Sequence, residues 1–319
     1  MDIAVAGEVL FDLSLEASDD DALHFAAREA GSPLNTALAA VRLGRPAGLL
    51  TQLSTDFFGQ RLWRFMGAHG LDRRFVTRGS APSSLAFVAH EGGSNQYAFY
   101  TEGTADSGWS PEPLPELPAD CRVLHFGSLA LLRQPAATRI LDLVRASRND
   151  RWISFDPNVR PSLVHEADRY RGDVADWMHL ADMVKLSEED AAYLAPGCTL
   201  DDAVARWLTL GPQALVVTRG AQGATLHRPG RPTLHLPAPQ VSVVDTVGAG
   251  DTFSAGLMVG LLDAGVRSRG DLDRLPDASW TEAMSLAGVA AALNCTRPGA
   301  QPPLRDVVDA YRATQPLNR

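Results

Sequence analysis

A regular alternation of short apolar runs with longer amphipathic segments constrains the fold of this 319-residue chain more than any other feature. The runs that predict strands lie at 3–6, 49–53, 123–126, 152–155, 183–186 and 215–218. The segments that predict helices lie at 32–42, 59–69, 135–147, 173–180, 188–194, 200–208, 250–264 and 280–294. Strands that alternate with helices form a mostly parallel sheet with helices on both faces. The sequence therefore predicts an α/β fold, with an antiparallel hairpin added at 224–227 and 233–236.

Two segments with a different pattern, short strand-like runs of alternating polarity, interrupt this alternation at 11–28 and 84–100. The second contains two strand-like runs that flank 91–95, Glu-Gly-Gly-Ser-Asn, a composition typical of a hairpin turn. We expect a small β-sheet lid, built from about 11–28 and 84–105, that projects from a single domain spanning 1–319. The proline-rich stretch 111–118 is expected to connect this sheet back to the main body.

Charge and cysteine usage exclude several classes of protein. The formal net charge is -9, whereas a nucleic-acid binder normally shows a basic face. No stretch approaches the roughly 20 apolar residues of a membrane span, and the N-terminus lacks the basic region of a signal peptide. The three cysteines are scattered and odd in number, which is typical of reduced thiols in a cytoplasmic protein.

The segment 243–253, Val-Val-Asp-Thr-Val-Gly-Ala-Gly-Asp-Thr-Phe, carries the strongest indication of chemistry. A strand end meets small residues and then a helix, so free backbone N–H groups point at whatever lies above the helix start. Such a turn is an anion site that suits a phosphoryl group. Asp251 falls in the first helical turn beside that site. Taken alone, Asp251 could equally be a carboxylate that complements the helix dipole.

At this point the chain resembles the ribokinase-like (PfkB) family of carbohydrate kinases, whose Asp-Thr-x-Gly-Ala-Gly-Asp signature is complete at 245–251. The resemblance extends from residue 3 to about 305, with Ala30 in place of a more usual glycine. Within the family the blocks around 125–128, 156–161 and 292–300 are most similar to bacterial fructokinases. The matching blocks are Gly7-Glu8-Val9-Leu10-Phe11-Asp12-Leu13, Ala30-Gly31-Ser32-Pro33-Leu34-Asn35, Phe155-Asp156-Pro157-Asn158-Val159-Arg160-Pro161 and Thr218-Arg219-Gly220-Ala221-Gln222-Gly223.

The resemblance implies a three-layer α/β/α fold with a β-sheet lid, and it implies roles for individual residues. Asp251 would be the general base, while the amides of Gly248, Ala249, Gly250 and Asp251 would stabilise the charge of the γ-phosphoryl. The residues that would contact the sugar or a phosphate are Asp12, Gly31, Asn35 and Arg160. Asp12 and Asn35, without the resemblance, would be read as polar groups at a strand end and at a helix start.

The resemblance also implies sites for ATP, Mg²⁺ and a monovalent cation such as K⁺. The residues along the nucleotide would be Ser187, Thr218, Gly220, Gly223 and Asn294. Asp190 would hold Mg²⁺ through water, although Ser187 and Asp190 replace the family's usual Asn and Glu. The same two residues also have the pattern of a capped helix start. The ligands of the monovalent cation would be the Asp245 side chain and carbonyls near Val247, Asn294, Arg297 and Gly299, while Pro303 replaces a serine.

The expected function is ATP-dependent phosphorylation of a sugar, with D-fructose as the first candidate. Ribose, 2-keto-3-deoxygluconate and a nucleoside remain alternatives, because pocket shape decides among them. A dehydrogenase Gly-x-Gly-x-x-Gly after the first strand and a P-loop are both lacking from the sequence. A sugar sensor without catalysis would be expected to lose Asp251 or the glycines. The lid is expected to pair with a second copy in a homodimer, because a small exposed sheet has apolar area and edges to protect.

Overall fold

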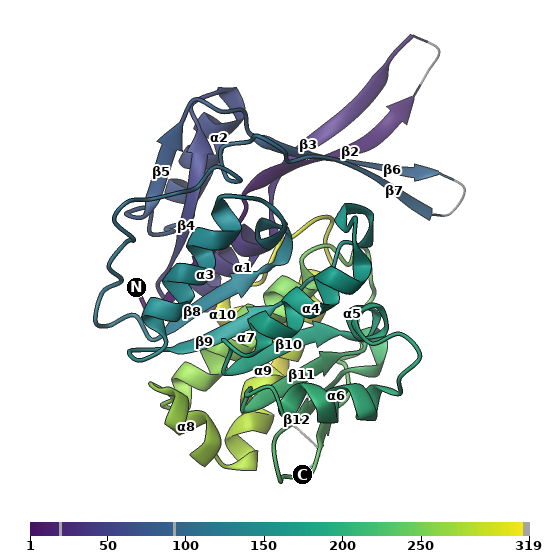
Figure 1. Cartoon of the computed structure of the whole chain (residues 1–319). Helices are drawn as coiled ribbons and strands as arrows, with labels where there is room; N and C mark the ends of the chain where they lie inside the picture. Colours follow the sequence, from purple (N-terminus) through teal and green to yellow (C-terminus); the bar gives the residue numbers. More distant parts are fainter. Residues whose placement is uncertain (19–20, 92–93, 315–319) are drawn as a thin grey trace.

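The computed structural model describes residues 1–18, 21–91 and 94–314, and its main body is built on one large sheet (Figure 1). Within these residues nine strands form this sheet in the order β13-β12-β11-β10-β9-β8-β1-β4-β5. Neighbours from β5 to β11 are parallel, whereas the β11–β12 and β12–β13 pairs are antiparallel. The strands are β1 (Ile3–Ala6), β4 (Ala47–Ser54), β5 (Val76–Gly79), β8 (Val123–Gly127), β9 (Trp152–Asp156), β10 (Met183–Ser187), β11 (Ala214–Thr218), β12 (Ala224–His227) and β13 (Leu234–Leu236).

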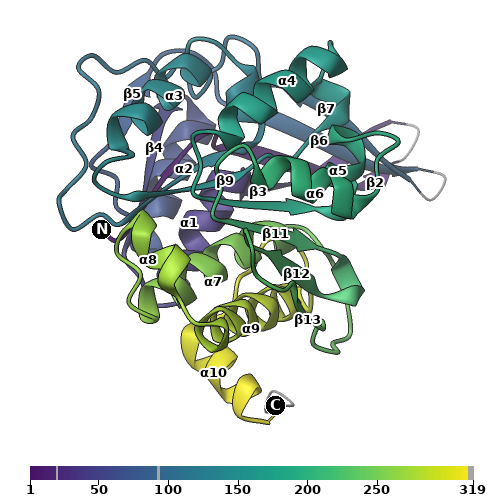
Figure 2. The same cartoon turned by 60° about the horizontal axis from the view of Figure 1, so that its bottom comes forward.

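Helices cover both faces of the large sheet, so the architecture has three layers (Figure 2). One core holds Ile3 and Val5 with α1 (Ser32–Arg42), α2 (Phe57–Ala68), α7 (Ala249–Asp263) and α9 (Asp277–Asn294). The other holds Ala4 and Ala6 with α3 (Ala136–Ser147), α4 (Ala167–Met178), α5 (Glu188–Leu194) and α6 (Leu200–Leu208). Alternate residues of a strand point to opposite faces, which is why one apolar run serves both cores.

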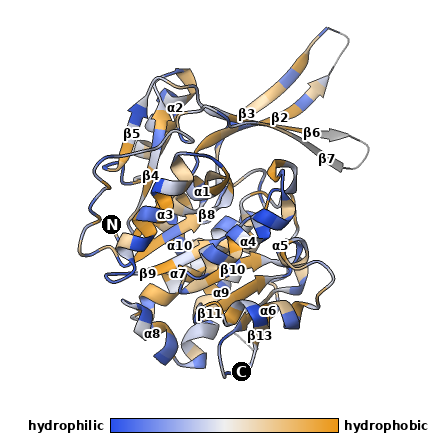
Figure 3. Cartoon of the chain, viewed as in Figure 1, coloured by the Kyte–Doolittle hydropathy of each residue, from blue (hydrophilic) through white to orange (hydrophobic). Residues whose placement is uncertain are grey.

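The strands of the large sheet are mainly hydrophobic, whereas the outer helices mix hydrophobic and hydrophilic residues (Figure 3). All four residues of β1 are buried, as expected for a strand that is covered on both faces. Two shorter elements, α8 (Arg269–Arg274) and α10 (Arg305–Thr314), add Leu272 and Val308 to the first core. None of the helices in the described part of the chain is long and apolar enough to cross a membrane.

A second sheet projects from the body, and we call it the small sheet (Figure 1). Its order is β3-β2-β6-β7, with bounds of β2 (Leu10–Ser18), β3 (Leu23–Ala30), β6 (Ser84–Glu91) and β7 (Ser94–Tyr100). Strands β2 and β6 are parallel, and the two outer pairs are antiparallel. The expected projecting sheet is therefore present, but its second half ends at Tyr100 instead of continuing to 105. The turn predicted at 91–95 includes residues 92 and 93, which lie outside the described residues.

The prediction was wrong about the start of α4, which begins at Ala167 and not at 173. Its buried residues are Tyr170, Val174, Trp177 and Met178, which recur with helical spacing. The first turn is polar apart from Ala167 and Tyr170, so it lacks the apolar signal on which the prediction relied. Strand β5 was not predicted at all, because Val76 is its single buried residue.

Candidate active site

The turn before α7 has a backbone conformation that only glycine adopts readily. Gly248 has a φ of 73°, and a methyl group there would lie 2.5 Å from Cβ of Ala300. The first bond of the helical ladder is donated by the Thr252 amide to the Gly248 carbonyl at 2.9 Å. The amides of Gly250 and Asp251 therefore precede the ladder and lie where a helix start can bind an anion.

Asp251 is a buried carboxylate, 8% exposed, in the first turn of α7. Its Oδ1 accepts a hydrogen bond from Oγ of Ser32 at 2.6 Å, and its Oδ2 accepts one from Nδ2 of Asn35 at 2.8 Å. Burial raises the pKa of Asp251, and these two hydrogen bonds act in the opposite direction. The carboxylate is thus held in one orientation beside the amides that precede the helical ladder.

The start of α1 supplies both donors to Asp251. Gly31 has a φ of 114°, and a methyl group at that position would lie 2.8 Å from the carbonyl oxygen of Glu8. The chain after β1 thus lies directly against the residue that begins α1, which requires a glycine. Pro33 stands at the first turn of the helix, where its missing N–H has no consequence. This packing brings Gly31 and Asn35, two of the predicted sugar contacts, next to the predicted base.

The other two predicted sugar contacts, Asp12 and Arg160, lie close enough for their charges to interact, and the charge of Asp251 also acts on Asp12. Burial raises the pKa of Asp12 to about 6, with Arg160 acting to lower it and Asp251 acting to raise it. The Arg160 guanidinium donates to Oδ1 of Asn158 at 2.7 Å, which fixes its position after β9. We refer to Asp251, Ser32, Asn35, Asp12 and Arg160 as the base cluster.

Ser187 and Asp190 form the capping box that their pattern predicted at the start of α5. The Asp190 amide donates to Oγ of Ser187 at 3.0 Å, and the Ser187 amide donates to Oδ2 of Asp190 at 2.9 Å. Oδ1 of Asp190 accepts from the Val159 amide at 2.8 Å. Two of the about four acceptor positions of the carboxylate are therefore used by backbone N–H groups. Asp190 ties the loop after β9 to α5 as well as capping the helix.

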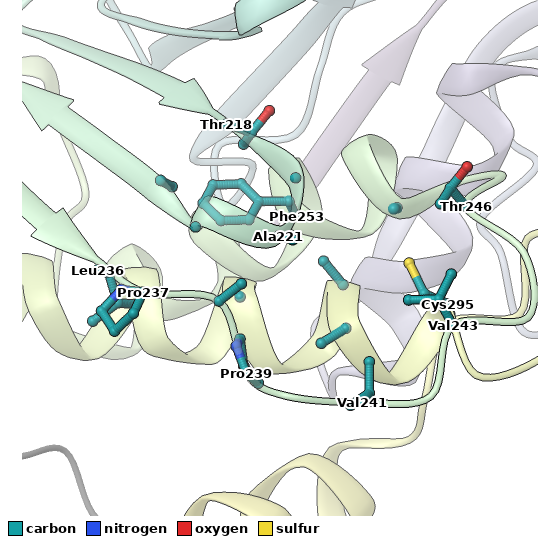
Figure 4. A pocket seen from close by; sticks show the side chains of 18 of the residues that line it. Thr218, Ala221, Leu236, Pro237, Pro239, Val241, Val243, Thr246, Phe253 and Cys295 are labelled. Carbon is teal, nitrogen blue, oxygen red and sulfur yellow. The ribbon is translucent and has the colours of Figure 1, made fainter.

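A cavity of about 300 Å³ opens on the other side of the α7 start, between the end of β11 and α9 (Figure 4). Small and apolar residues dominate its walls, and we call it the apolar cavity. Three predicted nucleotide contacts, Thr218, Gly220 and Gly223, line it, whereas Asn294 is fully buried and is not among the lining residues. The remaining lining residues include Ala221, Leu236, Pro237, Pro239, Val241, Val243, Thr246, Gly250, Phe253, Gly288 and Cys295.

The predicted cation ligands are tied together by hydrogen bonds. The Asp245 carboxylate accepts from the amides of Val247 at 3.0 Å and Gly299 at 2.7 Å. Nδ2 of Asn294 donates to the Val247 carbonyl at 2.8 Å, and the Asn294 carbonyl accepts from the Arg297 amide at 3.3 Å. Oδ1 of Asn294 is buried without a hydrogen-bond partner. The described residues contain no cluster of three or more His, Cys, Asp or Glu side chains suited to a metal ion.

Sequence reasoning missed the part that several residues play in the site. Ser32 donates to Asp251, but its position before Pro33 had indicated only a helix start. Ser254 lies one turn after Asp251, and its hydroxyl donates to Oδ2 of Asp156 at 3.1 Å. Its spacing from Asp251 is a signal that could have placed it on the same helix face. The segment 236–243 lines the apolar cavity, and a proline-rich stretch after a strand gave little warning of this.

Comparison with known proteins places this geometry among sugar kinases. Residues 1–307 match the sequence profile described as pfkB family carbohydrate kinase. The fructokinase of Rhizobium leguminosarum bv. trifolii is 35% identical over 259 residues, which cover 81% of this chain and 79% of that protein.

Two solved structures have the same fold over almost their whole length. The fructokinase from Xylella fastidiosa with bound ATP has a TM-score of 0.89 and 25% identity, covering 98% of this chain and 99% of that one. The aminoimidazole riboside kinase from Salmonella enterica, complexed with aminoimidazole riboside and an ATP analogue, has a TM-score of 0.82 and 26% identity, covering 97% and 99%. These matches confirm the expected three-layer α/β/α fold with a smaller separate sheet.

Proposed function

Because this chain belongs to the pfkB family of carbohydrate kinases, we propose that it transfers the γ-phosphoryl group of ATP to a hydroxyl of D-fructose. The observation that carries the proposal is the position of Asp251, a buried and oriented carboxylate in the turn that also presents the anion-binding amides. A general base must reach the attacking hydroxyl while the phosphoryl group is held next to it. Asp251 combines both requirements in one turn of the chain.

In the proposed reaction the sugar hydroxyl gives its proton to the Asp251 carboxylate. The hydroxyl oxygen forms a bond to the γ-phosphorus, while the bond from that phosphorus to the β–γ bridging oxygen breaks and ADP leaves. Ser32 and Asn35 orient the base by donating to its two oxygens. The amides of Gly248, Gly250 and Asp251 stabilise the charge on the transferred group, which is the main contribution a protein makes to this chemistry. The Ala249 amide, also expected to contribute, donates instead to the Thr246 carbonyl at 3.2 Å.

Asp12 and Arg160 are proposed to bind the sugar together with Gly31 and Asn35. Each sugar hydroxyl both donates and accepts, so a set with carboxylate, amide and guanidinium groups suits it. The small sheet, which carries Asp12, would close over the sugar and exclude water from the phosphoryl group. On this proposal the whole chain acts as one kinase domain in which the small sheet is the lid.

The residues present fit the cations that ATP chemistry requires. Mg²⁺ takes most of its ligands from phosphates and water, so one water-bridged carboxylate, Asp190, is sufficient on the protein side. When bound, Mg²⁺ would neutralise phosphate charge. Oδ1 of Asn294 is buried and unpartnered, while Nδ2 of the same side chain donates to the Val247 carbonyl, and carbonyl oxygens of this kind suit a monovalent cation such as K⁺. Asp245, Arg297 and Gly299 would complete that site.

ATP would occupy the apolar cavity with its base against the apolar walls and its phosphates toward Gly250. Thr218, Gly220 and Gly223 line the same cavity. Ser187 and Asn294 do not line it, so they would support the nucleotide site without lying in the cavity wall. We propose a cytoplasmic location; the three free thiols and the use of ATP support it.

We further propose a homodimer formed through the outer face of the small sheet. Phe25, Phe87 and Tyr100 form a row of edge-to-face ring contacts there, with centroids 5.2 and 5.6 Å apart. Tyr100 is 62% exposed and Leu23 is 61% exposed, so this face has apolar area to cover. A strict monomer by light scattering at working concentrations would contradict the dimer.

A coupled assay of ADP release tests the substrate. The purified chain with MgATP is offered D-fructose, D-ribose, 2-keto-3-deoxygluconate and aminoimidazole riboside, and kcat/KM is compared. The proposal expects D-fructose to give the highest value. A higher value for the riboside would favour the alternative suggested by the aminoimidazole riboside kinase, and a sensor would release no ADP with any of them.

A further inference from the structure

Lys185 is a buried cation in an otherwise apolar strand. Its neighbours Val184 and Leu186 are fully buried, and Lys185 itself is 5% exposed. Nζ of Lys185 donates to Oδ2 of Asp156 at 2.9 Å. Ser254 on α7 donates to the same oxygen, so β9, β10 and α7 meet at one buried carboxylate.

The Lys185 ammonium lies directly against the start of α7. A methyl group built on Gly250 would lie 2.9 Å from Nζ of Lys185. Gly250 is the residue whose amide precedes the helical ladder, so the ammonium lies next to the backbone of the anion site. Burial acts to lower the pKa of Lys185, but the charges of Asp156, Asp190 and Asp251 and the hydrogen bond to Asp156 hold it above its ordinary value. The side chain therefore stays an ammonium ion.

A contribution to stability does not by itself explain the buried ion pair of Lys185 and Asp156. Removing two charges from water is costly, and well-packed apolar residues often stabilise a fold as well or better. The charges around the site give a better reason. The negative charge of Asp251 acts on Asp12, that of Asp156 acts on Asp251, and ATP brings further negative charge. Arg160 is tied to the loop carbonyls near Asn158, which leaves Lys185 as the cation that faces Gly250 in the part of the chain the structure describes.

We propose that Lys185 is a positioning residue for phosphoryl transfer. Its ammonium is fixed by Asp156, which also accepts from Ser254, and it supplies a permanent positive charge next to Gly250. This charge offsets the negative charges of Asp251 and of the γ-phosphoryl. Lys185 keeps its proton throughout, since the hydroxyl proton goes to Asp251. This role rests on the proposed function of the site and deepens it. The pair joins Asp156, the last residue of β9, to Lys185 in the neighbouring β10, so its geometry needs no rearrangement when ATP arrives.

Single and double substitutions distinguish two roles for Lys185. It either offsets the charge of the transferred phosphoryl group or only neutralises the buried Asp156 carboxylate. The variants are Lys185→Met, Asp156→Asn and the two combined, assayed with the sugar that the unaltered chain phosphorylates best. We expect Lys185→Met to lower kcat by about 10- to 100-fold, with KM for the sugar within about threefold. The combined variant should stay as slow as Lys185→Met, while Asp156→Asn should be faster than both. A combined variant that returns to near the unaltered kcat would overturn the proposal, because Lys185 would then serve Asp156 alone.

A binding measurement tests the same role without turnover or sugar. Calorimetry with Mg²⁺ compares ADP with adenylyl imidodiphosphate, a non-hydrolysable ATP analogue that carries a γ-phosphoryl group. Lys185→Met should weaken binding of the analogue by about tenfold more than it weakens binding of ADP. Equal losses for both nucleotides would contradict the proposal even if the panel of sugars had shown no activity. If Lys185→Met does not fold, the combined variant, which leaves no unpaired buried charge, is compared with Asp156→Asn in the same titration.

Discussion

The base cluster and the apolar cavity flank the same helix start but are built in different ways. The base cluster consists of polar side chains from α7, α1, β2 and the loop after β9, each in a defined hydrogen-bonded or charged position. The apolar cavity consists of small residues, prolines and backbone. The difference suggests that chemistry depends on single atoms of the base cluster, whereas nucleotide binding depends on the shape of the cavity. Substitutions on the two sides should therefore change different kinetic constants.

The largest expected effect is that of Asp251→Asn. Asparagine keeps the shape and can still accept from Ser32, but it cannot take the hydroxyl proton. We expect kcat to fall by roughly 10²- to 10⁴-fold or more, while binding of sugar and ATP changes by no more than a few-fold. Steady-state kinetics and calorimetry on the same preparation measure the two quantities.

Asp263→Asn is the matched control, because Asp263 lies at the other end of α7 and pairs with Arg45 and Arg305 on the surface. It should leave kcat within about twofold, since surface ion pairs contribute little. If folded Asp251→Asn keeps near-normal kcat, the base lies elsewhere and the contrast between the two sides loses its foundation.

The dependence on pH should also separate the two sides. The pKa of Asp12 is about 6, so its carboxylate is ionised above that pH and becomes protonated below it. KM for the sugar should therefore rise below pH 6, by about tenfold for each further pH unit, while KM for ATP stays nearly constant. The raised pKa of Asp251 should make kcat fall on the acidic side as well, at a higher pH than an ordinary carboxylate would. Asp12→Asn should remove the first dependence and keep the second.

A smaller effect is expected from filling the apolar cavity. Gly288 on α9 lines the cavity, and a methyl group there would meet Leu236 and Pro239 at an ordinary 3.9 Å. Gly288→Leu should raise KM for ATP by about tenfold through loss of space, with little change in kcat or in KM for the sugar. Gly288→Ala is the control, because it adds one carbon and favours the helix. A large fall in kcat for Gly288→Leu would show that cavity shape also sets the chemistry.

The parts of the fold that local signals determine could be predicted from the sequence. Helices α5 and α6 have the predicted bounds because Ser187 and Thr199 cap them and an apolar face follows each cap. The start of α4 could not be predicted, since its first turn is polar and is held by Tyr170 packing into the second core. Strand β5 could not be predicted either, because an edge strand with one buried residue leaves no periodic pattern.

The candidate site likewise has parts that local sequence determines and parts that depend on residues far apart in the chain. Asp251 and the glycines before it form a contiguous motif whose geometry follows from the sequence alone. The partnership of Asp251 with Ser32 joins residues 219 positions apart, and nothing local in either segment specifies it. Lys185 had no predicted role because a single lysine in an apolar strand indicates neither its partner nor its direction. Its significance depends on Asp156 and Gly250, which come from two other elements.

The smallest expected effect tests whether the capping box of Ser187 and Asp190 only stabilises α5 or also contributes to nucleotide binding. Ser187→Ala removes the cap of α5, which should cost about 1 kcal/mol of stability. Thr199→Ala is a matched control: Thr199 caps α6 by accepting from the Asp202 amide at 3.2 Å and is not among the cavity-lining residues. Both variants should lose similar stability in thermal unfolding. If Asp190 holds a water of Mg²⁺, loss of the hydrogen bond from the Asp190 amide to the Ser187 hydroxyl should loosen the position of its carboxylate and raise KM for ATP in Ser187→Ala by about two- to threefold more than in Thr199→Ala. Equal KM values would assign the capping box to the scaffold, and nucleotide binding would then depend on cavity shape and the helix start alone.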